Sequence, residues 1–395
     1  GAHGPVSASV PSRPMPQGAA GGGEGRARSS LAGGAAVVAA AAAAAASQQR
    51  QATTGCDGEA SPSVHVGVAT LDGNCPNEDR HCVQHLGPGG RLGLACAVID
   101  GHGGWQVAEW LRAALVPAVE ERCRDLGEGD EGHALKAAFA SCEAALLRSV
   151  EKGALPCWVG ACALCVLVTP KQFLVANAGD CEALLLRDGR SLRLNSVHNA
   201  DQPMEQRRLQ AEHPGEGDVF VCKGGGVSGG DGWAQWLWQG LSRAGGGVEK
   251  LSACYVKGRL QPTRSFGDFY LKDRRFASPR ILGQDATPPY ITAEPEVVPV
   301  PRGPGDEALV LASDGLWDYL SGDDVARVAQ PFLAATRKEA PEATAPAQAL
   351  AEALAGEAVR CAAKVHGLTE AAVRAVPPGP RRSLHDDITV VVVLL

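Results

Sequence analysis

The sequence predicts a layered α+β fold, in which helices pack against β-sheets. Short apolar runs of strand length come in groups along the chain. Blocks of amphipathic, helix-forming sequence separate these groups, without the strict alternation of strand and helix that a doubly wound parallel sheet needs. The 395 residues are enough for one large domain or two ordinary ones with a substantial core.

The predicted elements follow from apolar patterning. Continuous apolar runs predict buried strands at Val64–Thr70, Leu92–Ile99, Ala163–Val168, Phe173–Ala176, Glu182–Leu186, Ala308–Ala312 and Ile388–Leu395. Helical spacing and composition predict helices at Trp105–Leu126, Ala134–Val150, Asp323–Thr336 and Ala347–Val365. Asp188-Gly189 predicts a hairpin between its flanking apolar runs, because a type I′ turn needs positive φ at both central residues.

Residues 1–62 differ in composition from the rest. They are rich in Gly, contain the alanine run Ala39–Ala46 and lack amphipathic periodicity, which predicts a disordered, low-complexity tail. The Arg and Ser content with few acids also fits a transit peptide. A single folded domain is expected over residues 63–395. Within it, a Gly-rich flap is predicted at about 214–262; its three tryptophans could dock a protein partner or form a small local core: Trp233, Trp236 and Trp238.

Composition excludes some classes of function. The formal net charge is −7, from 37 Lys+Arg and 44 Asp+Glu, and no basic patch suggests nucleic-acid binding. The run Leu31–Ala46 is too short and too weakly apolar for a membrane span. The 13 cysteines are odd in number and lie in apolar runs, which predicts buried thiols rather than a disulfide framework, as at Cys96, Cys162, Cys165 and Cys254. These features favour an intracellular protein, cytoplasmic or mitochondrial.

Several strand-like runs begin or end at an aspartate, and these positions carry the chemistry. The aspartates are Asp79, Asp100, Asp180, Asp314 and Asp386. Carboxylates gathered at one edge of a core would repel each other strongly unless a cation lay between them. Oxygen ligands without a Cys/His cluster suit Mg or Mn rather than zinc. Two such ions could share a bridging water and make it a nucleophile at neutral pH.

An ordered set of motifs carries a family resemblance. The motifs are Asn77-Glu78-Asp79, Asp100-Gly101-His102-Gly103-Gly104, Ala176-Asn177-Ala178-Gly179-Asp180, Arg264-Ser265-Phe266-Gly267-Asp268, Ala293-Glu294-Pro295-Glu296-Val297, Ala312-Ser313-Asp314-Gly315-Leu316-Trp317-Asp318 and Asp386-Asp387-Ile388-Thr389-Val390. Together they resemble the signature of the metal-dependent protein Ser/Thr phosphatases of type 2C (the PPM family). Further stretches resemble the pyruvate dehydrogenase phosphatase branch: Asn74–Arg80, His198-Asn199-Ala200, Glu212-His213-Pro214 and Pro288–Pro295.

The resemblance implies a fold, an activity and a set of site residues. It implies an αββα sandwich of two antiparallel sheets flanked by helices, with a binuclear Mn or Mg site at one end. The metal ligands would be Asp79, Asp100, the Gly101 carbonyl, Asp314 and Asp386, and Asp180 and Asp318 would hold a weaker third ion. Glu78 would bind a metal-held water, and His102 would be the general acid that protonates the departing Ser or Thr oxygen. The bridging hydroxide would attack phosphorus directly in a phosphoprotein substrate.

The sequence also departs from the family pattern. Asn74 stands where many members carry an arginine that grips the substrate phosphate, and it is expected to alter phosphate affinity more than competence. The other departures are Cys162, Cys181-Glu182 and Val197, none of which is expected to be a metal ligand.

Other interpretations of the sequence remain. Gly226-Val227-Ser228-Gly229-Gly230 fits the nucleophile elbow of a serine hydrolase, with Asp314 and His385 as partners, although its surroundings suggest a loop. The Gly-x-Gly-x-x-Gly pattern at Gly224–Gly229 lacks a βα unit, and Cys162-Ala163-Leu164-Cys165 lacks a second cysteine pair. The main rival is a catalytically silent phosphatase-like scaffold. The intact aspartates and His102 favour an active enzyme.

Overall fold

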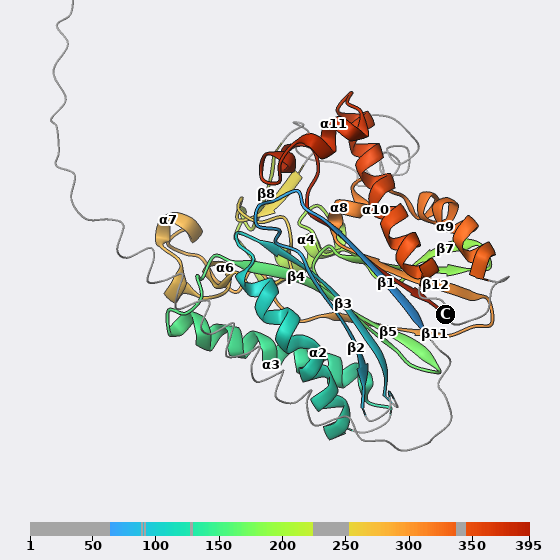
Figure 1. The fold of residues 1–395 in the computed structure, drawn as a ribbon. Helices are drawn as coiled ribbons and strands as arrows, with labels where there is room; N and C mark the ends of the chain where they lie inside the picture. Colours follow the sequence, from blue (N-terminus) through green and yellow to red (C-terminus); the bar gives the residue numbers. More distant parts are fainter. Residues whose placement is uncertain (1–63, 88–89, 91, 127–128, 224–252, 337–344) are drawn as a thin grey trace, which may run out of the picture.

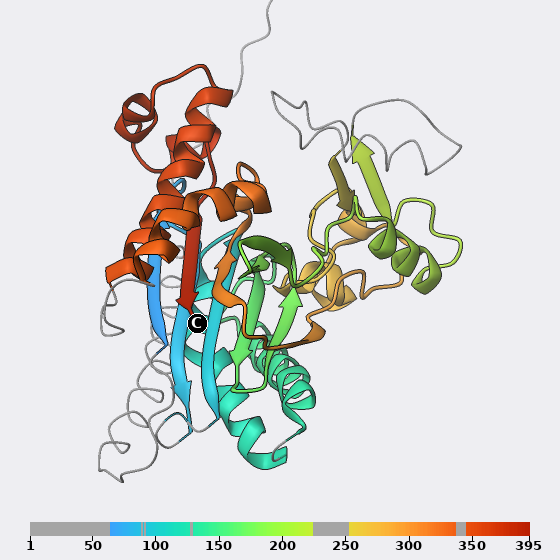
Figure 2. The same cartoon turned by 90° about the vertical axis from the view of Figure 1, so that its right-hand side faces the viewer.

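The computed structural model describes residues 64–87, 90, 92–126, 129–223, 253–336 and 345–395. Two antiparallel β-sheets face each other in this part of the chain, and helices cover the outer face of each sheet (Figures 1 and 2). The predicted α+β class with two antiparallel sheets and flanking helices is confirmed. The predicted tail, 1–62, lies outside the described residues.

Sheet A has five strands in the order β1-β13-β12-β6-β7, and all neighbours pair antiparallel. Asp188 and Gly189 have φ of 52° and 71°, so the predicted hairpin between β6 and β7 is confirmed. The strands are β1 (His65–Leu71), β6 (Glu182–Arg187), β7 (Arg190–Arg193), β12 (Asp306–Ala312) and β13 (Ile388–Leu394).

Sheet B has the order β11-β5-β4-β3-β2, and the short β10 also pairs with β4. Its strands are β2 (Arg80–Leu86), β3 (Gly93–His102), β4 (Gly160–Val168), β5 (Gln172–Ala178), β10 (Phe266–Gly267) and β11 (Glu296–Pro301). The sequence analysis did not predict β2 and β11, the two edge strands. β2 interrupts its apolar residues with Arg, His and Gln, and β11 contains two prolines, which only an edge strand tolerates.

Alternation along the central strands builds the layers. In β13, Val391 and Val393 point into the core between the two sheets, whereas Val390 and Val392 point toward the helices outside sheet A. Both faces of this strand are buried, because successive side chains of a strand point to opposite sides. The strand therefore has a continuous apolar sequence rather than an alternating one.

The four long predicted helices are present and cover the sheets. α2 (Gln106–Leu126) and α3 (Glu131–Glu151) pack on sheet B, and α9 (Gly322–Thr336) and α10 (Ala345–Val365) pack on sheet A. Shorter helices near the strand ends are α8 (Asp314–Trp317), α11 (Glu370–Ala375) and the 3₁₀ turn η3 (Pro380–Ser383). Among the described helices, none has both the length and the apolar composition that crossing a membrane requires.

A smaller hydrophobic cluster is formed by described residues between Ala200 and Ile291, and the elements that carry it lie beside the sandwich (Figure 2). It is centred on the fully buried Tyr290. Its elements are α4 (Pro203–Glu212), β8 (Phe220–Lys223), β9 (Ala253–Val256), α6 (Phe269–Lys272), η2 (Arg274–Phe276) and α7 (Pro279–Leu282). The predicted flap at about 214–262 falls partly outside the described residues. This also applies to Ser228, the Gly224–Gly229 pattern, Trp233, Trp236 and Trp238.

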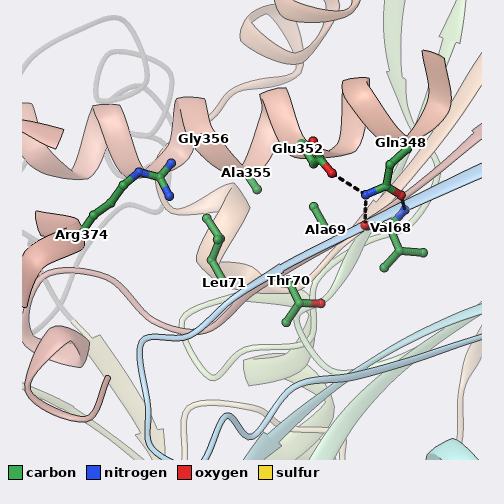
Figure 3. A pocket seen from close by; sticks show the side chains of 9 residues that line it. All are labelled: Val68, Ala69, Thr70, Leu71, Gln348, Glu352, Ala355, Gly356 and Arg374. Carbon is green, nitrogen blue, oxygen red and sulfur yellow. Dashed lines mark hydrogen bonds between the residues drawn. The ribbon is translucent and has the colours of Figure 1, made fainter. Parts of the chain in front are cut away.

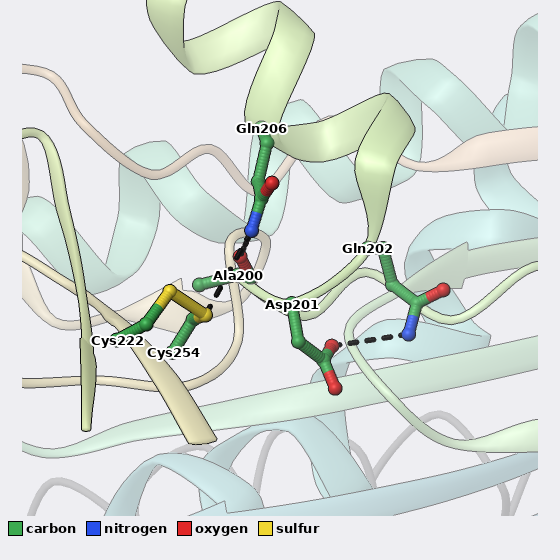
Figure 4. Close-up of a disulfide and its surroundings, with 6 residues drawn as sticks. All are labelled: Ala200, Asp201, Gln202, Gln206, Cys222 and Cys254. Carbon is green, nitrogen blue, oxygen red and sulfur yellow. Dashed lines mark hydrogen bonds between the residues drawn. A yellow bond between two sulfur atoms is a disulfide. The ribbon is translucent and has the colours of Figure 1, made fainter. Parts of the chain in front are cut away.

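One cysteine prediction is wrong. Cys222 of β8 and Cys254 of β9 stand directly opposite each other in the hairpin and form a disulfide (Figure 4). The Gln206 side chain on α4 lies against this disulfide and donates to the Ala200 carbonyl at 2.7 Å. The two cysteines are 32 residues apart, so their pairing depends on a strand register that the apolar pattern alone does not reveal. The other predicted buried thiols are confirmed as free and buried: Cys96, Cys162 and Cys165.

The free edge of sheet A is covered by a helix (Figure 3). Gln348 of α10 accepts the Val68 N–H at 3.0 Å and donates to the Val68 carbonyl at 2.8 Å, so a side-chain amide takes the place of a neighbouring strand. A Cβ at Gly67 would lie 2.2 Å from the Ala347 backbone, so glycine is needed for α10 to approach β1. A cavity of about 400 Å³ remains between this edge and α10.

Candidate active site

The strand register brings the predicted aspartates to one end of the sandwich. Asp79 directly precedes β2, and Asp100 lies near the end of β3, where Arg80 pairs with Ile99. Asp314 follows β12 and Asp386 precedes β13, at the end where Ala312 pairs with Val390. In an antiparallel pair, one strand begins where its neighbour ends. Asp79 and Asp100 therefore share one end of sheet B, and Asp314 and Asp386 share one end of sheet A.

A hydrogen bond joins the two sheets at this end of the sandwich. The buried Ser313 hydroxyl, at the end of β12, donates to Asp79 Oδ2 at 2.7 Å. The same hydroxyl accepts the Thr389 N–H of β13 at 3.0 Å. Ser313 therefore links the loop before β2 to both central strands of sheet A.

The clustered carboxylates disfavour each other's charge. Burial raises the pKa of Asp79 to about 7, and the negative charges of Asp387 and Asp386 add to this effect. Burial also raises the pKa of Asp100 and of Asp314 well above the ordinary value, and each feels the other aspartates of the cluster. Among the described residues, no Lys or Arg pairs with Asp79, Asp100 or Asp314. These three carboxylates therefore have no basic side chain beside them, whereas Asp386 has Arg382 as a partner.

The remaining predicted ligands lie in the same region. A Cβ at Gly101 would lie 2.5 Å from the Glu78 carbonyl oxygen, which shows how closely this glycine approaches the first motif. Asp180, between β5 and β6, is buried. Burial is the largest cause of the raised pKa of Asp314, and the charge of Asp180 is the next largest. Asp318 lies one helical turn beyond Asp314, is exposed, and also raises the pKa of Asp314.

Asp387 shapes the loop that carries Asn74 and Glu78, and the sequence analysis assigned it no role. Its carboxylate accepts three backbone N–H groups, from Gly73 at 2.7 Å, Asn74 at 2.8 Å and Glu78 at 2.7 Å. A carboxylate with this many donors fixes the loop firmly. The position of Asp387 next to Asp386 in the last motif was the available signal.

Asn74, Glu78 and Arg382 lie beside Asp386, and we refer to these three residues as the mouth of the carboxylate cluster. The Asn74 amide donates to Asp386 Oδ1 at 3.1 Å and to Asp387 Oδ2 at 3.0 Å. Burial raises the pKa of Glu78, and the positive charge of Arg382 opposes this rise. Arg382 also pairs with Asp386, with 3.1 Å between Nη2 and Oδ2. Sequence reasoning did not identify Arg382.

His102 is hydrogen-bonded to a buried aspartate. The His102 Nε2 lies 2.7 Å from Asp268 Oδ2, and the Ser265 hydroxyl donates to the same oxygen at 2.7 Å. Burial lowers the pKa of His102, but the charge and hydrogen bond of Asp268 outweigh this, so the pKa is raised overall. Asp268 itself is fully buried, with φ of 49°. The protonated imidazole is thereby stabilised and oriented. The Arg264–Asp268 motif was noted in the sequence, but Asp268 was not assigned to His102.

Gly160 leaves room for this pair, which gives the first prediction. A Cβ at Gly160 would lie 1.9 Å from Asp268 Oδ2 and 2.6 Å from His102 Nε2. We expect Gly160→Ala to separate the pair and to lower any turnover that depends on proton donation by His102 by about 10–10³-fold, because general acids contribute about 10²–10⁴-fold. Turnover of purified protein measures this. Gly132→Ala is the control, since its Cβ would meet only Val297 at 3.8 Å. Equal turnover in both variants would contradict the role of the pair.

The segment that carries Asp268 is fixed by a second buried carboxylate. Glu205 of α4 accepts from the Thr263 hydroxyl at 2.6 Å, from Arg264 at 2.9 Å and from Arg208 at 2.8 Å. Burial raises the pKa of Glu205, but these donors outweigh burial and lower the pKa to about 2. Thr263 and Arg264 directly precede the motif that ends at Asp268.

The second prediction concerns stability and pH. Because the pKa of Glu205 is lower in the folded chain than in the unfolded chain, its stabilisation is present at neutral pH and is lost as pH falls from about 4.5 to about 2. We expect Glu205→Gln to reduce the free energy of unfolding by about 1–3 kcal/mol at pH 7. Denaturant unfolding at pH 7 and pH 3 checks this. The difference between wild type and variant should be clearly smaller at pH 3, and a constant difference would contradict the argument.

The chemistry of the cluster fits a hard divalent cation, although the side chains do not converge into a closed site. In the part of the chain that the structure describes, no group of three or more His, Cys, Asp or Glu side chains is arranged to hold a metal ion. The fit lies in the donor set, which offers only oxygen ligands, and in Asp79, Asp100 and Asp314, which no Lys or Arg of the described residues neutralises.

The positions that depart from the family pattern do not form one cluster. Cys162 and Cys181 are buried, and Glu182 pairs with Arg193. Val197 is half-buried. Cys162 Sγ lies 3.9 Å from the Arg264 carbonyl oxygen, one residue before Ser265.

Comparison with known proteins identifies the family. The family model described as "Protein phosphatase 2C" matches residues 78–222 and 241–364, which include the motifs around Asp79, Asp100 and Asp314. The chain belongs to the protein phosphatase 2C family. This family comprises Mg- or Mn-dependent Ser/Thr protein phosphatases.

Curated relatives agree with this membership. The chain is 29% identical over 320 residues to "Probable protein phosphatase 2C 67" of Arabidopsis thaliana, covering 77% of this chain and 74% of that protein. It is 31% identical over 346 residues to "Probable protein phosphatase 2C 61" of Oryza sativa subsp. japonica, covering 83% of this chain and 80% of that protein.

Solved structures share the fold. The serine-threonine phosphatase 2C from Toxoplasma gondii matches with a TM-score of 0.54 and 18% identity, covering 85% of this chain and 96% of the other. A C. elegans sex determining protein matches with a TM-score of 0.57 and 20% identity, covering 85% of this chain and 66% of the other.

Proposed function

We propose that this protein phosphatase 2C chain is an active enzyme that hydrolyses phosphoserine and phosphothreonine in proteins, using two Mn or Mg ions. The observation that carries the proposal is the pairing of two features at one end of the sandwich. These are a group of carboxylates, of which Asp79, Asp100 and Asp314 have no Lys or Arg partner among the described residues, and a histidine whose protonated form Asp268 stabilises. A phosphatase needs the first to hold cations and the second to protonate a poor leaving group.

The ligand residues follow from the donor set. Asp79, Asp100, Asp314 and Asp386, with the Gly101 carbonyl, would hold two ions, and Asp180 and Asp318 would hold a weaker third. When bound, the ions supply a water that is acidic enough to ionise near neutral pH, together with positive charge facing the phosphate. Glu78 would accept a hydrogen bond from a water at the mouth of this group, and its raised pKa suits an acceptor that is not fully solvated.

His102 supplies the proton for the leaving group. Its Nε2 is bonded to Asp268, so the proton delivered to the departing Ser or Thr oxygen is the one on Nδ1. Asp268 acts as a positioning residue, because it touches His102 and not the substrate. Ser265 donates a hydrogen bond to this carboxylate, and Gly160 leaves the space that it occupies.

The finer branch assignment forms part of the proposal. The stretches Asn74–Arg80 and Pro288–Pro295 resemble the pyruvate dehydrogenase phosphatase branch, and a phosphoprotein is the substrate class that the family implies. The compartment is proposed to be the cytoplasm or the mitochondrion, and the location of the phosphoprotein substrate would distinguish them.

The deciding experiment is p-nitrophenyl phosphate hydrolysis by the purified chain, titrated separately with Mn and Mg, with chelator as the control. We expect turnover that depends on metal and is abolished by chelator. Absence of turnover in protein that still binds Mn by calorimetry would overturn the proposal and favour the silent scaffold.

A further inference from the structure

The acidic end of the sandwich needs a cation that can meet a substrate phosphate. A phosphate monoester carries close to two negative charges, and a group of carboxylates repels it. Among the described residues, Arg382 is the cation whose ion pairs reach Glu78 and Asp386. Its side chain is 50% exposed, so a ligand in solution can reach it.

Asn74 cannot serve as a phosphate donor in this arrangement. A side-chain amide has two N–H donors, and those of Asn74 are directed at Asp386 Oδ1 and Asp387 Oδ2. What remains is the amide oxygen, which accepts hydrogen bonds and offers nothing to a phosphate. The loop position that resembles the family's phosphate-binding site is therefore occupied by a residue that is committed to carboxylates.

The loop that carries Arg382 is fixed in place. The neighbouring Arg381 donates to three backbone carbonyls, of Val376 at 2.8 Å, Asp72 at 2.9 Å and Arg374 at 3.0 Å. The Gly379 N–H donates to the Gly73 carbonyl at 2.8 Å. These bonds attach η3 directly to the loop that carries Asn74 and Glu78, so Arg382 is held at the mouth.

We propose that Arg382 binds the phosphoryl group of the substrate and takes the role that Asn74 cannot fill. The inference rests on the proposed phosphatase function. A guanidinium has five N–H donors in a planar fork, which is more than the ion pairs with Asp386 at 3.1 Å and Glu78 at 3.9 Å can engage. Arginine and phosphate form bidentate, charge-assisted hydrogen bonds, which suits recognition of a phosphoryl group regardless of the peptide that carries it.

The test compares Arg382→Gln and Arg382→Lys with wild type in the Mn-loaded full chain. We measure KM and kcat for a phosphothreonine peptide and for p-nitrophenyl phosphate, and the inhibition constant of inorganic phosphate. For Arg382→Gln we expect KM for both substrates, and the phosphate inhibition constant, to rise about 10–100-fold, since hydrogen bonds to charged groups are worth about that factor. Arg382→Lys should lie between, because it keeps the charge but loses the fork.

Arg327→Gln is the matched control, an exposed arginine that pairs with Asp324 and Glu357 on the helices outside sheet A. It should leave all three constants unchanged. If Arg382→Gln weakens Mn binding by calorimetry but leaves the phosphate inhibition constant unchanged, Arg382 acts only as a counter-charge to Asp386, and the proposal is overturned. A KM that rises for the peptide alone would also overturn it. Inactive wild type, by contrast, would refute the proposed phosphatase function itself.

Discussion

Replacing Asp314 with alanine should abolish phosphatase activity while leaving the chain folded. Asp314 follows β12 at the centre of the carboxylate group, where burial and the charges of Asp180, Asp318 and Asp386 raise its pKa. Metal ions stabilise transition-state charge by several kcal/mol, so the loss of a ligand should lower metal-dependent turnover by about 10³-fold or more.

The stability of this variant separates a ligand from a structural residue. Without metal, removing one of several mutually repelling carboxylates should leave the thermal midpoint of Asp314→Ala equal to or above that of wild type. Adding Mn should raise the midpoint of wild type by mass action and raise that of the variant far less. Thermal unfolding with and without Mn measures both effects. The control is Asp285→Ala, at an exposed position outside the carboxylate group. Full turnover in Asp314→Ala would show that the metal assignment is wrong.

Replacing His102 with alanine should slow poor leaving groups far more than activated ones. A serine or threonine oxygen must be protonated as it departs, whereas p-nitrophenol departs without a proton. We therefore expect about 10²–10⁴-fold slower hydrolysis of a phosphothreonine peptide, and a much smaller change for p-nitrophenyl phosphate. The ratio of the two kcat values, measured for wild type and variant, is the readout.

Two further variants test how the histidine is held. Asp268→Asn keeps the size of the side chain but removes the charge that stabilises protonated His102, so the same ratio should change in the same direction by a smaller factor. His133→Ala, at an exposed histidine on α3, should leave the ratio unchanged. Equal slowing of both substrates in His102→Ala would count against the general-acid role.

Much of the fold could be predicted because its central strands are buried on both faces. Continuous apolar runs such as that of β13 are visible without any structure. The edge strands β2 and β11 escaped because exposure on one side relaxes the apolar pattern. Disulfide formation between Cys222 and Cys254 also escaped, because it depends on which residues face each other across a hairpin.

The candidate site divides in the same way. Asp79, Asp100 and Asp314 stand out because each adjoins a strand and a characteristic motif. Asp268 did not stand out, because its role depends on a contact with His102, 166 residues away. Arg382 lies only four residues before Asp386, but its ion pair with Glu78 depends on the fold. Motifs reveal which residues matter, and only the three-dimensional structure shows which partner each one orients.

The pairing of β13 with both β1 and β12 has a consequence for synthesis on the ribosome. β13 lies between these two strands, with His65 opposite Leu394 on one side and Ala308 opposite Leu394 on the other. During translation, β1 and β12 emerge long before the strand that joins them, and each exposes an unpaired edge in the meantime. Asp386 and Asp387 emerge with that same strand. A nascent chain would therefore keep these edges exposed to aggregation, and its carboxylate group incomplete, until this segment has left the exit tunnel.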